Sequence, residues 1–458
     1  ELLYGFWNKK RIFPIVDNQR FCVIIIDKGS TDKVTNVAFD QTELIKWEKN
    51  DIDTITLGAH FIEKVNPINK SIIQVESQID VSSLELIYDH SILYKDYCES
   101  INSNGYKTEY HMTNDRNKFL PVENIIHDKL NFHDVGYLFQ GNIYIPMYTG
   151  KLMDLCDFAA KKWISGHGRG AHYEPIPFEN KDWYPEFIMP IENAKHKWHG
   201  GIRLVCRDLT DPTNKRTVIA ALIPAWPCSN KVPVLIDEDE LDIINMLKLF
   251  AVISSFIFDY VCRMKMVGIN LNKFILDELP IPDLDKIPDE ACILIARYAL
   301  PHKIFAKSWK LLLDKFPDLN CREWGEWFAI SEYDRMYFRA IIETIVSKAY
   351  EFNREKDTLI SHILTPDIIR PKSFHKYDSH LPIEERLPVL SLKCIKDNYE
   401  AKSIDLIGKQ FCGNWTLPIK SNSNLNNKDV GGNDLSWGIC AELVALYANL
   451  EDEKVVLD

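Results

Sequence analysis

The sequence predicts an α+β protein whose C-terminal part is mostly helical. Phe21–Ile26 is a continuous, β-branched run, the pattern of a strand that is covered on both faces. Further strand-like stretches stand at 141–145, 201–205 and 217–223. Beyond Leu279–Pro282, apolar residues recur three and four positions apart, as they do on the buried face of a helix.

The composition is that of an ordinary globular protein. Of 458 residues, 46% are apolar and 26% charged, which excludes intrinsically disordered, collagen-like and membrane-bundle classes. The net charge of −12 argues against a general polyanion-binding protein, although it allows a local basic face. The eleven cysteines contain no Cys-x-x-Cys pair, so we expect reduced thiols and a cytoplasmic protein. The apolar run Leu249–Phe258 is too short for the ~20 residues of a membrane span.

Residues 1–64 are expected to form the first domain. A strand at Phe21–Ile26 that is covered on both faces needs a sheet around it, and the 20 preceding residues are too few to supply one. We therefore expect the chain to begin inside a fold whose main part lies upstream.

Residues 65–285 are expected to form a second, α+β domain. Apolar spacing predicts a helix over Ser82–Tyr97 and a longer one over Glu240–Lys265. The longer helix starts in an acidic stretch and has Arg263 and Lys265 in its last turn, as the helix dipole favours. Leu279–Asp283, with its alternating prolines, reads as a rigid extended boundary.

Residues 286–458 are expected to form a third, mostly helical domain. Apolar spacing predicts helices over Glu290–Ala299 and Asp334–Glu355. From Pro366 onward, clusters of Pro, Asn and Gly predict loops.

A cation-rich segment stands out within the acidic chain. Between Lys195 and Lys231 there are seven Lys or Arg but only two acids, Asp208 and Asp211, and His196, Trp198 and His199 are interleaved with them. Basic side chains next to aromatic ones suit phosphate contacts and base stacking. The alternative is an ordinary solvated face.

A turn within this segment carries many hydrogen-bond donors. Asp211-Pro212 initiates the turn, and arginines, threonines and an asparagine surround it over Arg207–Thr217. Arginine forks fit phosphates or guanine edges, and asparagine can pair with adenine. Alternatively, the loop is merely capped by its Asp and Thr side chains, with Arg216 paired to Asp208.

Five segments, taken in order, resemble the C-terminal half of the large adenine-specific DNA methyltransferases of bacterial restriction–modification and phage-defence systems, including fused restriction–methylation enzymes. The resemblance covers most of residues 1–365. The segments are Asn8–Ile15 with Arg20–Val23, Tyr110–Asn114, Ile145–Met153, Arg207–Asp208 with Thr213–Thr217, and Asn245–Arg263 with Gly268–Phe274 and Leu279–Pro282.

The resemblance implies that residues 1–64 are the last strands of a methyltransferase-type α/β sheet, that 65–285 are the DNA target-recognition domain and that 286–458 are a helical brace. The family's Asn/Asp-Pro-Pro-aromatic motif is missing, since the chain has no Pro-Pro dipeptide. Gly166–Gly170 is the only candidate for the glycine-rich S-adenosylmethionine loop, but it lacks the preceding acid and reads as a flexible linker. We therefore expect no catalytic residue, cofactor or metal in this chain, and the resemblance implies an S-adenosylmethionine-dependent catalytic domain upstream.

The expected function is sequence-specific binding of double-stranded DNA. Phosphate contacts fix the register and a few polar side chains read the bases. The residues expected to contact phosphates are Arg203, Arg207, Lys215 and Arg216, and those expected to read bases are Arg169, Thr213 and Asn214. Further expected DNA contacts are Lys151, Lys161, Lys162, Thr217, Asn270 and Lys273.

Two other functions remain open. A protein-interaction subunit of a defence complex would suit the net acidity and the helical C-terminal part. A complete nuclease would need converging acids and a lysine, and Asp283, Asp285 and Lys286 read better as a boundary loop. His196 and His199 have helical metal-ligand spacing but no obvious third ligand.

Overall fold

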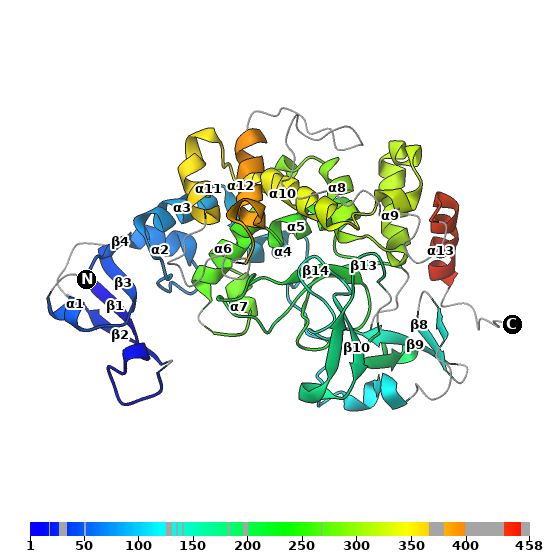
Figure 1. The fold of residues 1–458 in the computed structure, drawn as a ribbon, viewed down its shortest axis with the longest axis horizontal. Helices are drawn as coiled ribbons and strands as arrows, with labels where there is room; N and C mark the ends of the chain where they lie inside the picture. The colour runs from blue at the N-terminus through cyan, green and yellow to red at the C-terminus, as the bar shows by residue number, and fades with distance from the viewer. Residues whose placement is uncertain are drawn as a thin grey trace.

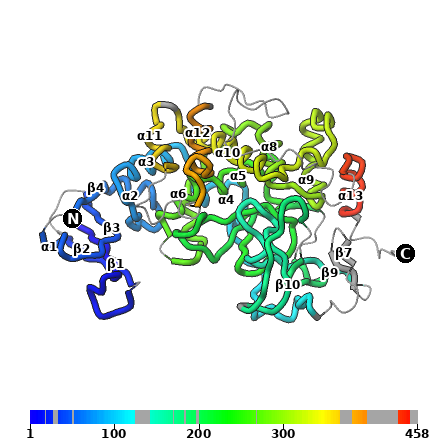
Figure 2. The backbone as a smooth tube through the Cα atoms, viewed as in Figure 1, coloured from blue at the N-terminus to red at the C-terminus, as the bar shows by residue number. Residues whose placement is uncertain are grey.

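The structure is a computed structural model with a mixed α+β fold, as the sequence predicted. It describes residues 1–17, 19–26, 34–49, 52–124, 131–133, 136–139, 142–181, 184–195, 200–266, 268–365, 380–398 and 435–449. Figure 1 shows a broad helical layer with two β-rich lobes on its lower side, one from the N-terminal residues and one around β10. The tube in Figure 2 traces the same arrangement, with the N-terminal sheet and helix α13 (Trp437–Asn449) at opposite sides of the molecule.

The N-terminal lobe is a four-stranded sheet in the order β2-β1-β3-β4. Its strands are β1 (Leu2–Trp7), β2 (Arg20–Ile25), β3 (Val34–Gln41) and β4 (Ile55–Gly58). β1 is parallel to β3 and antiparallel to β2. Helix α1 (Ile45–Glu48) follows β3, and α2 (Ala59–Val65) continues from β4 and turns Phe61 and Val65 into the main core.

The expectation that Phe21–Ile26 is covered on both faces is wrong for the described part of the chain. β2 stands at the edge of its sheet, and Ile24, Ile25 and Ile26 are 55%, 49% and 71% exposed. The β-branched run does form a strand, but one that has a neighbour only on its β1 side among the described residues.

The predicted helix at 82–97 is interrupted. Helix α3 (Gln78–Asp89) is followed by a short strand, β5 (Ser91–Leu93), and by α4 (Tyr94–Ser100). β5 pairs antiparallel with β16 (Pro280–Pro282), the segment predicted to be extended. A partner almost 190 residues away therefore overrides the local helical spacing.

The central residues form the second lobe and the sheet beneath the helices. A five-stranded sheet has the order β6-β12-β9-β8-β7, β10 and β11 form a separate hairpin, and a buried sheet has the order β14-β13-β15. The bounds are β6 (Leu120–Pro121), β7 (Asn131–His133), β8 (Gly136–Phe139), β9 (Asn142–Met147), β10 (Lys161–Ser165), β11 (His172–Pro175), β12 (Phe187–Pro190), β13 (Ile202–Cys206), β14 (Ala220–Pro224) and β15 (Val234–Ile236). β9, β13 and β14 confirm the three predicted strand-like stretches.

The predicted long helix at 240–265 is two helices, α5 (Ile243–Ile253) and α6 (Phe256–Lys265), which meet at 56°. The Ser255 hydroxyl accepts from the backbone N–H of Phe258 and so caps a new helix. The carbonyl of Ser254 accepts from the guanidinium groups of Arg216 and Arg339, so the break is filled by polar partners. Within the described part of the chain no single helix is long and apolar enough to cross a membrane, and this bent pair meets those criteria only jointly.

The remaining helices form the layer that covers the sheets. The α-helices are α7 (Lys273–Leu276), α8 (Ala291–Ala299), α9 (Ala306–Lys315), α10 (Glu332–Ala349), α11 (Asp357–Leu364), α12 (Leu387–Asn398) and α13 (Trp437–Asn449). The short 3-10 helices are η1 (Asn8–Lys10), η2 (Arg116–Lys118), η3 (Val122–Asn124), η4 (Gly168–Gly170), η5 (Ile191–Asn193), η6 (Leu284–Lys286), η7 (Lys303–Phe305), η8 (Pro317–Cys321), η9 (Trp324–Trp327), η10 (Arg354–Lys356) and η11 (Ile383–Glu385).

α8 and α10 confirm the predictions for 290–299 and 334–355. The prediction of loops beyond Pro366 is wrong where α12 and α13 stand, and the predicted loop clusters at 421–427 and 431–432 lie outside the described residues.

Helix α10 ties the helical layer to the loop before β10. Arg335 donates to the carbonyl of Cys156 at 3.2 Å, and Arg339 donates to the Cys156 thiol at 3.3 Å. Both arginines are buried, and Arg335 stacks on Phe178 with its guanidinium carbon 3.4 Å from the ring centre. The helical layer thus holds the loop from which the β10–β11 hairpin emerges.

Candidate nucleic-acid interface

Arg203 lies in the middle of the buried sheet, on β13. It is 1% exposed, and its guanidinium forms two hydrogen bonds to Asp237, of 2.9 and 3.0 Å, and one of 3.0 Å to Glu109. The expectation that Arg203 contacts phosphate is therefore wrong, because its charge is already neutralised inside the protein.

Arg216 is also an interior residue. It is 6% exposed, lies 3.5 Å from the carboxylate of Asp259 and donates to the carbonyls of Ser254 and Ser255. Burial lowers the pKa of Arg216, and the nearby Asp259 opposes that shift. Both the phosphate contact and the alternative pairing with Asp208 are wrong, since Asp208 pairs with Lys231.

Arg207 is half-buried and turns inward, where it donates to the carbonyl of Met153. The three arginines expected to form one cationic strip therefore point into the protein. They are buried because acids and carbonyls that are distant in sequence surround them. The local sequence around each arginine does not indicate which partners it will have.

The turn at 211–215 is a capped loop, as the alternative reading expected. The Asp211 carboxylate accepts from the N–H of Thr213 at 2.7 Å and from its hydroxyl at 2.6 Å. From beneath, Arg263 donates to the carbonyls of Asn214 and Lys215. Asn214 is half-buried and Thr217 fully buried, so only Lys215 remains exposed among the residues of this turn that were expected to bind DNA.

Two further candidates stand next to that turn. Asn270 forms an isolated β-bridge with Leu209 and is half-buried. Lys273 pairs with Asp277 at 2.7 Å, and its side chain is 43% exposed. Leu209, Ile269 and Phe274 are each more than half exposed, so this edge of the molecule has an apolar surface.

The β10–β11 hairpin presents an exposed lysine in a stretch of sequence without acids, although the fold brings Glu123 to within 2.5 Å of His167. Lys161 is exposed, and Lys162 is half-buried opposite Glu174 on the partner strand. The segment between Asp157 and Glu174 contains no Asp or Glu, and carries Arg169 and two histidines besides the lysines. The side chain of Arg169 lies outside the described atoms.

The glycine-rich run at the hairpin tip is a defined turn, so the interpretation as a flexible linker is wrong. Gly166 has φ of +74°, and a Cβ there would lie 2.7 Å from the carbonyl oxygen of Gly170. The Trp163 indole donates to the carbonyl of Gly166 at 2.8 Å, and the N–H of Gly168 donates to Glu186 at 3.0 Å. The tip is therefore preorganised.

Lys151 supports this tip from below. Its ammonium donates to the carbonyls of Gly168 and Ala171 and lies 5.0 Å from the centre of the Tyr173 ring. The Tyr173 hydroxyl donates to Glu186 at 2.6 Å. Burial, followed by the hydrogen bond to Glu186, raises the pKa of Tyr173, so the hydroxyl stays a donor. Lys151, predicted as a DNA contact, is exposed but already positions the loop.

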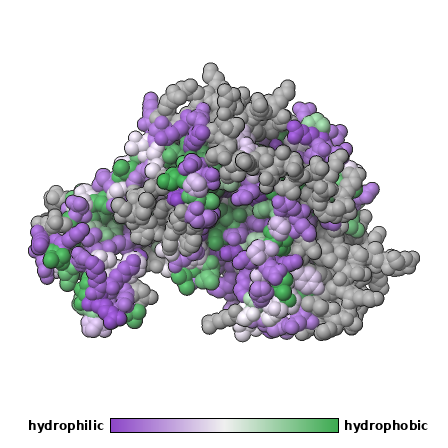
Figure 3. Space-filling view, in the orientation of Figure 1, coloured by the Kyte–Doolittle hydropathy of each residue, from purple (hydrophilic) through white to green (hydrophobic). Residues whose placement is uncertain are grey.

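The outline of the molecule is notched between the two lobes. Figure 3 shows hydrophilic surface on both lobes where they flank this notch. The N-terminal lobe lies on one side of the notch and the lobe that carries the β10–β11 hairpin lies on the other, as Figure 1 shows. The sequence offered no signal for this arrangement, because it depends on how two separate sheets attach to one helical layer.

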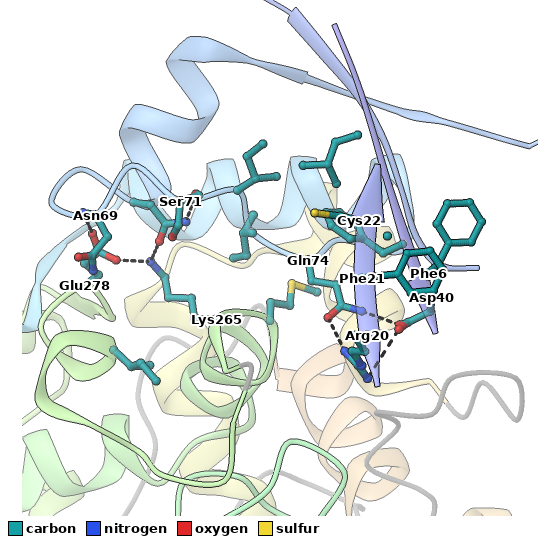
Figure 4. Close-up of a pocket in the computed structure, with 18 of the residues that line it drawn as sticks. Phe6, Arg20, Phe21, Cys22, Asp40, Asn69, Ser71, Gln74, Lys265 and Glu278 are labelled. Carbon is teal, nitrogen blue, oxygen red and sulfur yellow. Dashed lines mark hydrogen bonds and ion pairs between the residues drawn. The ribbon is translucent and has the colours of Figure 1, made fainter. Parts of the chain in front are cut away.

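A pocket of about 610 Å³ lies where the N-terminal sheet meets α6 and α7. Figure 4 shows Lys265 and Glu278 at one end and Arg20, Asp40 and Gln74 at the other. Lys265 is 3.5 Å from Glu278 and donates to Asn66. Burial lowers the pKa of Lys265 to about 8, against the opposing effect of Glu278. The polar ends pair internally, so they brace this junction.

The Gly166–Gly170 run does not suit S-adenosylmethionine as a glycine-rich cofactor loop. It joins two antiparallel strands, whereas such a loop links a strand to the N-terminus of a helix. In the described residues, no group of three or more His, Cys, Asp or Glu could hold a metal ion. His196 and His199 lie outside those residues.

Comparisons with protein-family models, with curated proteins and with solved structures found no match for this chain.

Proposed function

We propose that this chain is the target-recognition portion of an adenine-specific DNA methyltransferase of a bacterial restriction–modification or defence system, and that it grips duplex DNA for a catalytic domain. In that enzyme, S-adenosylmethionine supplies the methyl group and the target adenine is flipped out of the duplex. The ordered set of family-like segments supports this proposal, and the geometry of one hairpin supports that hairpin as the DNA contact.

The observation that carries the proposal is the β10–β11 hairpin. A two-stranded ribbon fits the major groove of DNA, where each base pair presents a distinct pattern of donors and acceptors. The ribbon has an exposed lysine, Lys161, and two exposed histidines, which pair with Glu123 and Glu174. Its tip is held by Glu186 and Lys151. A rigid tip loses little conformational entropy when it docks.

The role of each remaining candidate follows from its exposure. Lys161 and Lys215 contact phosphates and hold the register, since both are exposed. For Arg169 the assignment rests on backbone position alone: it belongs to η4 at the tip of the hairpin, and we assign it the reading of a base edge. Arg203, Arg207 and Arg216 take no part in DNA contact and instead hold the scaffold.

The catalytic domain docks on the N-terminal sheet. Ile24, Ile25 and Ile26, at the end of the edge strand β2, are 55%, 49% and 71% exposed. Exposed apolar side chains on an open strand edge are typical of a face that another chain or domain covers. We therefore assign the outer edge of β2 as the interface with the catalytic domain.

Binding of a duplex at several salt concentrations tests the proposal. Wild-type protein should bind duplex DNA at low salt and lose affinity steeply as salt rises. The double variant Lys161→Gln/Lys162→Gln should weaken binding on all sequences and make the salt slope shallower by about one for each phosphate that the variant no longer neutralises. Lys310→Gln, which changes a lysine on α9 that pairs with Asp314, is the matched control and should change neither the affinity nor the slope. An absence of duplex binding at low salt would reject the proposal.

A protein-interaction subunit is the second candidate function. The uncovered N-terminal sheet favours it, because an apolar edge binds protein as readily as it binds a catalytic domain. Stable co-elution with a partner protein, together with no affinity for DNA, would support this function over the first.

A further inference from the structure

The described residues of the loop between β1 and β2, 8–17 and 19, are organised by one buried side chain. Asn8 is fully buried, and its amide donates to the carbonyls of Phe13, Ile15 and Val16 at 3.1–3.3 Å. Its side-chain oxygen accepts from the N–H of Phe13 at 2.9 Å. Four hydrogen bonds from one side chain fix the path of this loop, which we name the Asn8 loop.

The tip of the Asn8 loop is apolar and exposed. Phe13, Ile15 and Val16 are 47%, 49% and 69% exposed, and Pro14 stands between them. The Phe13 ring rests edge-on against Phe21, with ring centres 4.8 Å apart, so it is supported from behind. Three exposed apolar side chains on a loop that is held rigid form a wedge rather than a collapsed coil.

Cations flank this wedge. Residues 7–20 contain four cations, Lys9, Lys10, Arg11 and Arg20, and one acid, Asp17. Three of them form ion pairs, Lys10 with Glu43, Arg11 with Asp17 and Arg20 with Asp40. The side chains of the first two pairs are all at least 39% exposed, and that of Arg20 is 42% exposed. Exposed ion pairs of this kind contribute little and exchange readily for phosphate. Lys9 and Arg20 stack on the Trp7 ring and keep their charged ends beside the loop.

We propose that the Asn8 loop inserts its apolar tip between base pairs of the bound duplex, with the flanking cations on the adjacent phosphates. This inference rests on the proposed function and adds a second DNA contact on the opposite lobe. Proteins that kink DNA insert Phe, Ile or Pro side chains between base steps, beside basic residues that hold the backbone. In Figure 1 the β1–β2 loop and the β10 lobe project from the same side of the helical layer, so one duplex can meet both.

The charge favours DNA over a protein partner. The four cations face three acids, Asp17, Asp40 and Glu43, so a small excess of positive charge remains, and within a chain of net charge −12 it is complementary to a polyanion. An anionic membrane surface offers the same charge and an apolar interior, so vesicles enter the experiment as a competing outcome.

Fluorescence of 2-aminopurine tests the wedge. The duplex carries 2-aminopurine beside flexible TA steps, and its fluorescence rises when the base is unstacked. We expect wild-type protein to raise the signal. The exposed-tip variant Ile15→Ser/Val16→Ser should abolish the rise and bind roughly tenfold more weakly, with an unchanged salt slope, because it removes apolar contacts and no charge. Ile45→Ser, which changes an exposed apolar residue elsewhere on this lobe, is the control and should behave like wild type.

Each outcome decides between the two proposals. If wild-type protein binds the duplex but the tip variant gives the same affinity and the same fluorescence rise, the wedge is wrong and the proposed function stands. If wild-type protein fails to bind any duplex, both fail. If the tip variant loses binding only to vesicles of phosphatidylserine and phosphatidylcholine, the loop is a membrane contact and the wedge is overturned.

Discussion

The guanidinium of Arg203 faces the carboxylate of Asp237 across two hydrogen bonds of 2.9 and 3.0 Å, in a site that is almost closed to solvent. Asp237 follows β15, the strand that pairs with β13. The pair therefore joins two strands of the buried sheet, and an arginine that looks like a DNA contact in the sequence is part of the core.

Arg203→Met should destabilise the protein by about 3–5 kcal/mol, because it leaves Asp237 and Glu109 buried without their cation. Urea unfolding followed by circular dichroism measures the loss. Lys310→Met, which removes one partner of an exposed pair, should cost less than about 1 kcal/mol. An Arg203→Met protein that keeps its stability yet loses DNA binding would contradict the structural role.

The stability of the protein should depend on pH through the ionisation of Asp80. Burial alone raises the pKa of Asp80, but hydrogen bonds from His362, Tyr260 and the N–H of Glu76 outweigh it and hold that pKa at about 2. Because the folded-state pKa is below the unfolded value of about 3.9, the stabilisation is fully present above pH 4 and is lost as the pH falls toward 2. Its size is about 2 kcal/mol.

Asp80→Asn should therefore be less stable than wild type at pH 7, and the difference should shrink as the pH is lowered from 4 toward 2. Unfolding by urea at a series of pH values measures this. Asp89→Asn, on the same helix but with an exposed carboxylate, should follow the wild-type curve within about 0.5 kcal/mol. A constant difference between Asp80→Asn and wild type at all pH values would show that the carboxylate charge is not the cause.

Gly166→Ala should distort the hairpin tip. The residue has φ of +74°, and the new Cβ would meet the carbonyl oxygen of Gly170, so the local cost is about 1–3 kcal/mol. If the hairpin reads DNA, the variant should bind duplex DNA several-fold more weakly. Gly170→Ala, which has open space around its Cβ, should bind normally. Equal binding by both variants would remove the hairpin tip from the interface.

Cys22 and Cys321 should react first with a thiol reagent in the native protein. They are the exposed ones among the ten cysteines within the described residues, and burial raises the pKa of others, such as that of Cys98 to about 11. Mass mapping after a short pulse of iodoacetamide measures the order of labelling. Cys22 lies on β2, so a bound catalytic domain should protect Cys22 and leave Cys321 reactive.

Local pattern was sufficient for several elements. β13 and β14 arise from runs of β-branched and apolar residues, and α8 and α10 from apolar spacing, because burial of one continuous stretch needs no information from elsewhere. The pattern was not sufficient at α5 and α6, where apolar residues continue through a bend that depends on Ser255 and on arginines from other elements.

The sequence by itself determined the α+β class, the extended segment at 280–282, the three strands β9, β13 and β14 and the turn at Asp211, because each depends on residues that are neighbours in the chain. Only the tertiary structure decided which cations are exposed to solvent. Arg203 and Arg216 lie inside because Asp237 and Asp259, 34 and 43 positions away, come within 3.5 Å of them, whereas Lys161 is exposed at the base of a hairpin. A buried charge requires a partner, and the partner is chosen by the fold.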